Sequence, residues 1–200
     1  MATGIEIRVL TGSAPSLAAC VPDLARLRIT VFREFPYLYV GTTAYEEQYL
    51  KTYLDCAESV VILALEGSEV IGASTGLPLE YETAAFKRPF VAAGLAPAAV
   101  FYCGESVLLP AYRGRGVYRE FFAGREQHAR TLGRFSRMVL CAVDRAPDHP
   151  RRPPVYQPLD AVWQRFGYAK RADLVTTFDW QDLDEATESP KRMVFWEKPL

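Results

Sequence analysis

The chain has 200 residues, of which 50% are hydrophobic and 12% aromatic, so it is long enough to bury a sizeable core. Its 23 basic and 24 acidic side chains leave a formal net charge of −1, which excludes the broad basic field typical of nucleic-acid and membrane-surface binders. An anionic ligand would have to be met by a local cluster of cations. No apolar run approaches 18 residues and no signal-like pattern begins the chain, so we predict a cytoplasmic protein without membrane or nucleic-acid partners.

Cysteine and histidine usage argues against a metal centre. The four cysteines are scattered without a CxxC pair, and the two histidines have no partner at ligand spacing. We therefore interpret the cysteines as small core residues of a reduced protein and predict no metal.

A strand pattern opens the chain and two helix patterns follow. Residues 5–10 alternate apolar and polar side chains, as a half-buried strand does. Apolar residues then recur at helical spacing as far as Pro36, with a start at or shortly before Pro22. The capping-box pair Thr43 and Glu46 predicts the start of the second helix.

Strands and helices continue to alternate to the end of the chain, which indicates one α/β domain with a central sheet and helices on both faces. The remaining predicted elements are two strands within 59–79 around a turn at 66–69, a helical insert at about 81–94, a strand at 99–109, a helix at 116–132, a strand at 138–143, a helix at 159–168 and strands at 174–180 and 192–198.

The turn YRGRGVY lies between a predicted strand and a predicted helix. Free main-chain N–H groups and the positive end of the helix dipole converge at such a point. Gly114 and Gly116 permit positive φ and close approach of a ligand, and Arg113 and Arg115 supply fork-shaped donors for phosphate. The turn is chemically suited to hold a pyrophosphate, and the alternative is a glycine turn with solvated arginines.

Two familiar phosphate-binding patterns do not fit this turn. A Walker loop needs a Lys-Ser/Thr pair, which is absent. The dinucleotide fingerprint needs a third glycine where the chain has Arg119, and it should follow the first strand of a βαβ unit.

The stretches SVLLPAYRGRGVYREFF and AVWQRFGY resemble the GNAT superfamily of acyl-CoA-dependent N-acetyltransferases. The first is similar to the family pattern Gln/Arg-x-x-Gly-x-Gly/Ala, with Arg113 and Gly116 at the first and fourth positions and Tyr118 in place of the usual Gly or Ala. The second has an aromatic residue, Trp163, four positions before Gly167. The resemblance implies a GNAT-like α/β fold over residues 1–200, with a central, mixed, mostly antiparallel sheet of about seven strands that is splayed in the middle.

The resemblance further implies that acetyl-CoA is the cosubstrate. Main-chain groups of the strand before the turn would pair with the pantetheine arm, and those of the turn would hold the pyrophosphate. The residues concerned are Ser106, Val107, Leu108, Arg113, Gly114, Arg115, Gly116, Val117 and Tyr118. The arginine side chains are secondary, with Arg115 reaching the 3′-phosphate or facing water.

The implied reaction is direct attack of a primary amine on the thioester, which requires a general base. Relatives use a tyrosine as the acid where this chain has Trp163, and an indole cannot protonate a thiolate. Our candidate base is Glu105, because a carboxylate inside an apolar strand should have a raised pKa. The alternative is an edge-facing or salt-bridged glutamate. Tyr102 and Tyr156 are lesser candidates, and strand alternation separates Tyr102 from Glu105 unless a bulge intervenes.

The acceptor is a small-molecule or peptide amine that the sequence does not identify. Between the first two helices, aromatic and acidic residues could form a recess for a cationic amine: Glu34, Tyr37, Tyr39 and Glu46. The alternative is that the aromatics are core and the glutamates solvated. Arg151 and Arg152 in the loop 144–158 suggest an acidic acceptor instead, and the two indications conflict.

Three function classes remain open at this point. The first is an acetyl-CoA-dependent N-acetyltransferase acting through a ternary complex, for which the family makes a homodimer possible. The second is a non-catalytic acyl-CoA-binding module, which the missing tyrosine acid favours. The third is a dinucleotide-binding protein.

Overall fold

A computed structural model describes residues 4–12 and 14–200. The strands are β1 (Glu6–Thr11), β2 (Val60–Glu66), β3 (Glu69–Pro78), β4 (Val100–Leu108), β5 (Arg137–Val143), β6 (Ala169–Trp180) and β7 (Ser189–Pro199). The helices are α1 (Pro15–Ala19), α2 (Val21–Phe32), α3 (Thr43–Leu54), α4 (Ala84–Ala92), α5 (Val117–Leu132) and α6 (Asp160–Arg165). None of the helices in the described residues is long and apolar enough to span a membrane.

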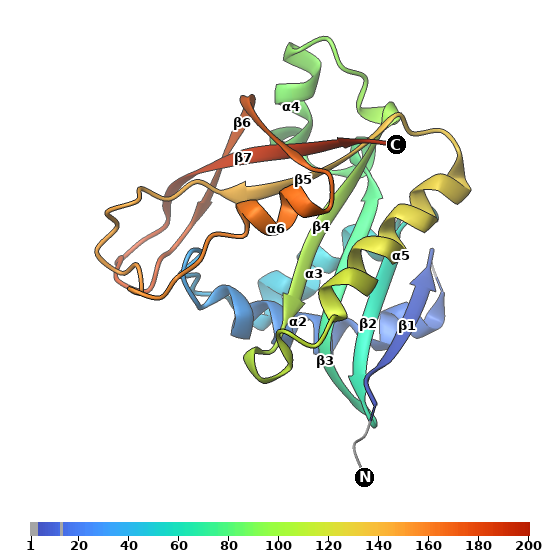
Figure 1. Cartoon of the computed structure of the whole chain (residues 1–200), viewed down its shortest axis with the longest axis horizontal. Coiled ribbons are helices and arrows are strands. Elements are labelled where there is room, and N and C mark those ends of the chain that lie inside the picture. Colours follow the sequence, from blue (N-terminus) through green and yellow to red (C-terminus); the bar gives the residue numbers. More distant parts are fainter. Residues whose placement is uncertain (1–3, 13) are drawn as a thin grey trace.

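The seven strands form one mixed sheet in the order β1-β2-β3-β4-β5-β7-β6. Every neighbouring pair is antiparallel except β4 and β5, which run parallel. Helices α2, α3 and α4 cover one face of the sheet, and α5 and α6 pack on the other (Figure 1). The predicted sheet with helices on both faces is confirmed.

The sheet is splayed between β4 and β5. These strands pair only from Val100 to Cys103 of β4, against 137–140 of β5. Beyond that point they diverge, as Figure 1 shows, while β4 stays paired with β3 as far as Leu108. In the described chain, the facing edges of β4 and β5 past the divergence therefore have main-chain N–H and C=O groups that pair with no neighbouring strand.

A β-bulge lies in β4 just past the divergence. Gly104 and Glu105 together lie opposite the single β3 residue Thr75. The extra residue reverses the side-chain alternation, so that Tyr102 and Val107 both pack into the core beneath α2, α3 and α4. The sequence analysis left open whether a bulge lies between Tyr102 and Glu105. The bulge is present, and it puts both side chains on the same face of the sheet.

The start of α3 differs from the sequence-based expectation. The N-cap is Thr42, whose Oγ1 accepts a hydrogen bond from the main-chain N–H of Tyr45 at 3.3 Å. Glu46 does not complete a capping box with Thr43, because its carboxylate is buried in an ion pair with Arg28 of α2. A tertiary partner has displaced the local one.

Candidate active site

The divergence of β4 and β5 opens into a cavity of about 330 Å³. One wall comes from β4 at its bulge, a second from α5, and a third from the segment after α2 and the loop after β5. Its lining includes Phe32, Tyr37, Glu105, Ser106, Tyr118, Phe122, Arg125, Arg145, Arg152, Tyr156 and Trp163. Over the described ranges, no group of three His, Cys, Asp or Glu side chains is placed to hold a metal ion.

The turn before α5 has the backbone that its glycines predict. Gly114 and Gly116 have φ values of 78° and 84°, which favour glycine over any residue with a Cβ. A Cβ at either position would meet nothing within 4 Å, so the conformation, and not the space, requires glycine. The main-chain N–H groups of residues 114–118 donate to no acceptor within the described part of the chain. Five successive free donors at a helix start form an anion-binding arrangement.

The arginines of the turn are held by protein groups. Arg113 donates through Nε to the Leu108 carbonyl at 3.2 Å and pairs through Nη1 with Glu34 at 2.9 Å. The guanidinium of Arg115 lies 5.1 Å from the centre of the Tyr112 ring and stays exposed. Glu34 was predicted to bind the acceptor amine, but it does not line the cavity; it is an exposed partner of the turn.

Of the other residues predicted to bind the coenzyme, some line the cavity and some are buried in the hydrophobic core. Val107 and Val117 are buried in the core, as is Leu108, so their side chains are unavailable and only their main chain can contact a ligand. Ser106 lines the cavity, and its hydroxyl lies 3.1 Å from that of Ser74. Tyr118 also lines the cavity, so a phenol ring occupies wall space that Gly or Ala would leave open.

Glu105 is buried, as predicted for a general base, and it is also salt-bridged, as the alternative interpretation predicted. Its Oε2 accepts a 2.6 Å hydrogen bond from Nη1 of Arg28, whose Nε binds Glu46. Oε1 of Glu105 is buried and has no hydrogen-bond partner among the described residues. Burial raises the pKa of Glu105, and the charge of Arg28 opposes that rise. Glu105 is therefore a residue of the cavity lining whose Oε2 is held by Arg28 and whose Oε1 is buried without a hydrogen-bond partner among the described residues.

Three of the four residues predicted to surround the acceptor amine do not line the cavity. Glu46 is fully buried beneath Arg28, and Tyr39 lies beside it, with burial and the Glu46 charge raising the pKa of its phenol. Neither residue lines the cavity. Tyr37 alone of the four predicted residues does so, because the chain places the other three around α2 and α3.

The two lesser catalytic candidates have different outcomes. Tyr102 is 3% exposed, packs against Phe86 and does not line the cavity, so its role as an acid or base is not supported. Tyr156 does line the cavity, with its ring centre 4.6 Å from that of Phe35. Burial raises the pKa of the Tyr156 phenol.

Gly104 leaves room for two hydroxyl groups next to Glu105. A Cβ there would lie 2.1 Å from the Tyr53 hydroxyl and 2.5 Å from Oγ1 of Thr75. Thr75 Oγ1 in turn accepts the main-chain N–H of Glu105 at 3.3 Å, and Tyr53 lies 3.2 Å from the Tyr49 hydroxyl. The bulge is thus lined by polar groups on the α3 side, which the sequence alone did not indicate.

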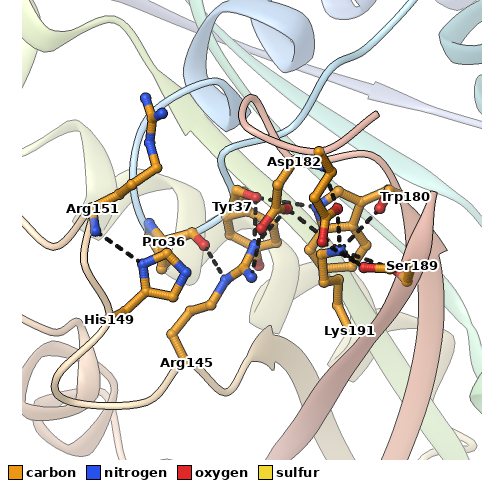
Figure 2. A network of polar contacts seen from close by, with 10 residues as sticks. Pro36, Tyr37, Arg145, His149, Arg151, Trp180, Asp182, Ser189 and Lys191 are labelled. Carbon is orange, nitrogen blue, oxygen red and sulfur yellow. Dashed lines mark hydrogen bonds and ion pairs between the residues drawn. The ribbon is translucent and has the colours of Figure 1, made fainter. Parts of the chain in front are cut away.

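A clamp of polar contacts fixes the segment that carries Tyr37 (Figure 2). Arg145, which follows β5, donates to the carbonyls of Pro36 and Tyr37 at 2.7 and 2.8 Å and pairs with Asp182 at 2.7 Å. Lys191 binds the Trp180 carbonyl at 3.1 Å in the same network. Arg145 lines the cavity, but its charge is already neutralised by Asp182.

The loop 144–158 places few charged side chains in the cavity. His149 accepts a hydrogen bond at Nδ1 from the main-chain N–H of Arg151 at 3.2 Å (Figure 2). Neither residue lines the cavity, whereas Arg152 does, with its guanidinium 5.2 Å from the Tyr156 ring centre.

Solved structures share this architecture over nearly the whole chain. An acetyltransferase of the GNAT family from Streptococcus pneumoniae matches with a TM-score of 0.59 at 13% identity, covering 98% of this chain and 100% of its own. The chain has the GNAT fold. NAA60 from Arabidopsis thaliana, solved with a bisubstrate analogue, matches with a TM-score of 0.60 at 12% identity over 98% and 99% of the two chains. yncA from Salmonella typhimurium, solved with its cofactor acetyl-CoA, gives 0.58 at 12% identity over 98% and 94%. No family model and no curated protein matches the sequence.

Proposed function

We propose that the protein is an N-acetyltransferase that moves an acetyl group from acetyl-CoA to a primary amine by direct attack in a ternary complex. The observation that carries the proposal is the cavity at the splay, which joins the unpaired edges of β4 and β5 to a turn with five free N–H donors. The GNAT fold supports it, and so does yncA, a neighbour solved with acetyl-CoA.

The main chain supplies most of the proposed donor site. The free edge of residues 106–108 would pair with the amide groups of the pantetheine arm, as a neighbouring strand would. The free N–H groups of 114–118 and the α5 dipole would hold the diphosphate. Arg115, which no carboxylate neutralises in the described residues, would reach the 3′-phosphate.

Glu105 is the proposed general base. The amine nitrogen forms a bond to the thioester carbon, the C–S bond breaks with its electrons going to sulfur, and the carboxylate takes a proton from nitrogen. Oε1 is suited to this step because Arg28 occupies only Oε2. The raised pKa of Glu105 makes the carboxylate a stronger base than a solvated glutamate.

A non-catalytic acyl-CoA-binding module is the second candidate. It is favoured by Trp163, which lines the cavity where relatives were expected to have a tyrosine acid. Both candidates predict coenzyme A binding, and only the first predicts turnover. The acceptor would be a small-molecule or peptide amine, and we keep a reduced, cytoplasmic protein as the working expectation.

Calorimetric titration with acetyl-CoA, CoA, NADH and ATP tests the donor site. Binding of acetyl-CoA and CoA without NADH fits both candidates, and no binding of either CoA species would refute both. Binding of NADH alone would favour a dinucleotide-binding protein.

Release of free thiol in the presence of a panel of amines then tests catalysis. Glu105→Gln should lower kcat by a factor of about 10² to 10⁴ while acetyl-CoA still binds. Glu69→Gln, at the exposed first residue of β3, is the control and should match the wild type. Activity of the wild type should rise with pH through the raised pKa of Glu105, because the base must be ionised. An active Glu105→Gln enzyme would remove Glu105 from the mechanism.

A further inference from the structure

Arg125 of α5 is a buried cation without a counter-ion. The residue is 2% exposed and lines the cavity. Nη1 donates to the main-chain carbonyl of Glu105 at 3.3 Å, and the guanidinium lies 4.7 Å from the centre of the Phe122 ring. Nε is buried and makes no hydrogen bond to any described residue, and no carboxylate of the described ranges forms an ion pair with Arg125.

Two other arginines beside the cavity are neutralised, whereas Arg152 of the loop after β5 lies against the Tyr156 ring. Arg28 has two carboxylates, and Arg145 has Asp182 together with two carbonyls. A desolvated cation is costly unless it is paired and hydrogen-bonded. Arg125 is therefore unlike Arg28 and Arg145, and its unbalanced charge and unpartnered Nε indicate that an anion arrives from outside the protein.

The position of Arg125 along α5 restricts which anion this is. It lies nine residues after Gly116, which corresponds to about 13 Å of helix. The phosphates of a coenzyme held at the turn would thus be far from its guanidinium. It contacts the bulge carbonyl of β4, where that strand leaves β5. Away from the phosphates, the transfer develops negative charge first on the carbonyl oxygen of the tetrahedral intermediate and then, when the C–S bond breaks, on the sulfur. Only the charge on sulfur remains in the product complex with coenzyme A.

We propose that Arg125 stabilises the coenzyme A thiolate as it leaves, an assignment that rests on the proposed function. When the C–S bond breaks, both electrons remain on sulfur, and the guanidinium balances the resulting charge. The amine proton goes to Glu105, so the thiolate needs no proton in that step and takes one from solvent after release. Trp163 then does not have to act as an acid, which accounts for a cavity without the expected tyrosine.

The pKa of the bound thiol reports this contact without relying on turnover. We would titrate the CoA complex with pH and follow the ultraviolet absorbance of the thiolate. In the wild type the bound thiol should have a pKa about 1 to 3 units below that of free CoA, as a nearby opposite charge produces. Arg125→Met should abolish that difference, and Arg125→Lys should keep part of it.

Arg130→Met is the matched control, because Arg130 lies on the same helix but pairs with Glu126 at the surface. It should leave the bound thiol pKa at the wild-type value. Thermal melts of each variant establish that it is folded. If Arg125→Met does not fold, the wild type alone still tests the proposal. The ratio of its affinity for CoA to its affinity for desulfo-CoA, which lacks the thiol, should increase as the pH rises.

The outcomes separate this assignment from the proposed function. A wild-type complex whose thiol titrates like free CoA overturns the role of Arg125 and leaves the acetyltransferase proposal standing. The same holds if Arg125→Met weakens CoA binding without moving the thiol pKa, which would place Arg125 against the pantetheine arm. If CoA does not bind at all, the proposed function fails, and the role of Arg125 fails with it.

Discussion

Replacing Arg28 by methionine should destabilise the protein strongly, because this one side chain balances two buried carboxylates. The Arg28 side chain is 11% exposed, and those of Glu46 and Glu105 are 0% and 2% exposed. Water cannot replace the lost guanidinium at such depth. Breaking a buried ion pair by removing one partner costs about 3–5 kcal/mol. We expect a loss of free energy of unfolding in this range for Arg28→Met at pH 8.

The loss should depend on pH in a defined direction. Burial already raises the pKa of Glu105, and Arg28 holds it down. Without Arg28 the folded-state pKa rises further above the unfolded-state value. When the pKa of a carboxyl group is higher in the folded state than in the unfolded state, the group does not destabilise the fold at a pH below its unfolded-state pKa. The fold loses stability as the pH rises through the folded-state pKa, because the buried group then has to ionise. The deficit of Arg28→Met should therefore be smaller at pH 5 than at pH 8.

Urea unfolding followed by circular dichroism at both pH values measures this deficit. Arg130→Met, which breaks an exposed i,i+4 pair, should cost no more than about 0.5 kcal/mol and show little pH dependence. Adding Glu105→Gln to Arg28→Met should recover part of the loss, since the buried charge is then gone. Equal losses for Arg28→Met and Arg130→Met, or a deficit that is the same at pH 5 and pH 8, would refute the reasoning.

Three further changes test other parts of the site. Gly104→Ala should cost about 1–3 kcal/mol in urea unfolding and lower activity, because its Cβ would overlap the Tyr53 hydroxyl; an unchanged midpoint would contradict the packing at the bulge. Gly116→Asp should weaken CoA binding by roughly tenfold or more in calorimetry. The control Gly67→Asp, at a glycine of the β2–β3 turn with φ of 61°, should leave the affinity for CoA unchanged. Equal CoA affinities of the two variants would count against the turn before α5 as the diphosphate site. Burial raises the pKa of Glu82 to about 7, so Glu82→Gln should stabilise the protein by about 3 kcal/mol at pH 8 and much less at pH 5, and a uniform effect would exclude that titration.

Local patterns predicted most of the fold. The β2–β3 hairpin, the strand before Pro110 and the helix after Gly116 occur where alternation and turn glycines indicated them. The capping box at Thr43 and Glu46 was wrong because Arg28, 18 residues away, takes the carboxylate. Such a pairing depends on how α2 packs on α3, which no short pattern records.

The site was predicted less completely than the fold for a related reason. Glu34, Tyr39 and Glu46 were grouped because they are close in sequence, and the tertiary structure places none of them in the lining of the cavity. The sequence analysis did not predict the buried Arg125 as a residue of the site, although its position in α5 indicated it. Arg125 falls at the i+4 spacing of the inward face of α5, between Phe121 and Ala129, and a charge on that face is an exception that needs a partner.

The β4 bulge is the feature that joins these residues into one site. At this single strand position the Glu105 side chain contacts Arg28 on one face of the sheet, and the Glu105 carbonyl accepts from Arg125 on the other. One arginine therefore fixes the proposed base, and the other lies where a thiolate would leave. The bulge gives the Glu105 side chain and the Glu105 carbonyl different partners, and a regular strand without the bulge would turn the Glu105 side chain away from Arg28.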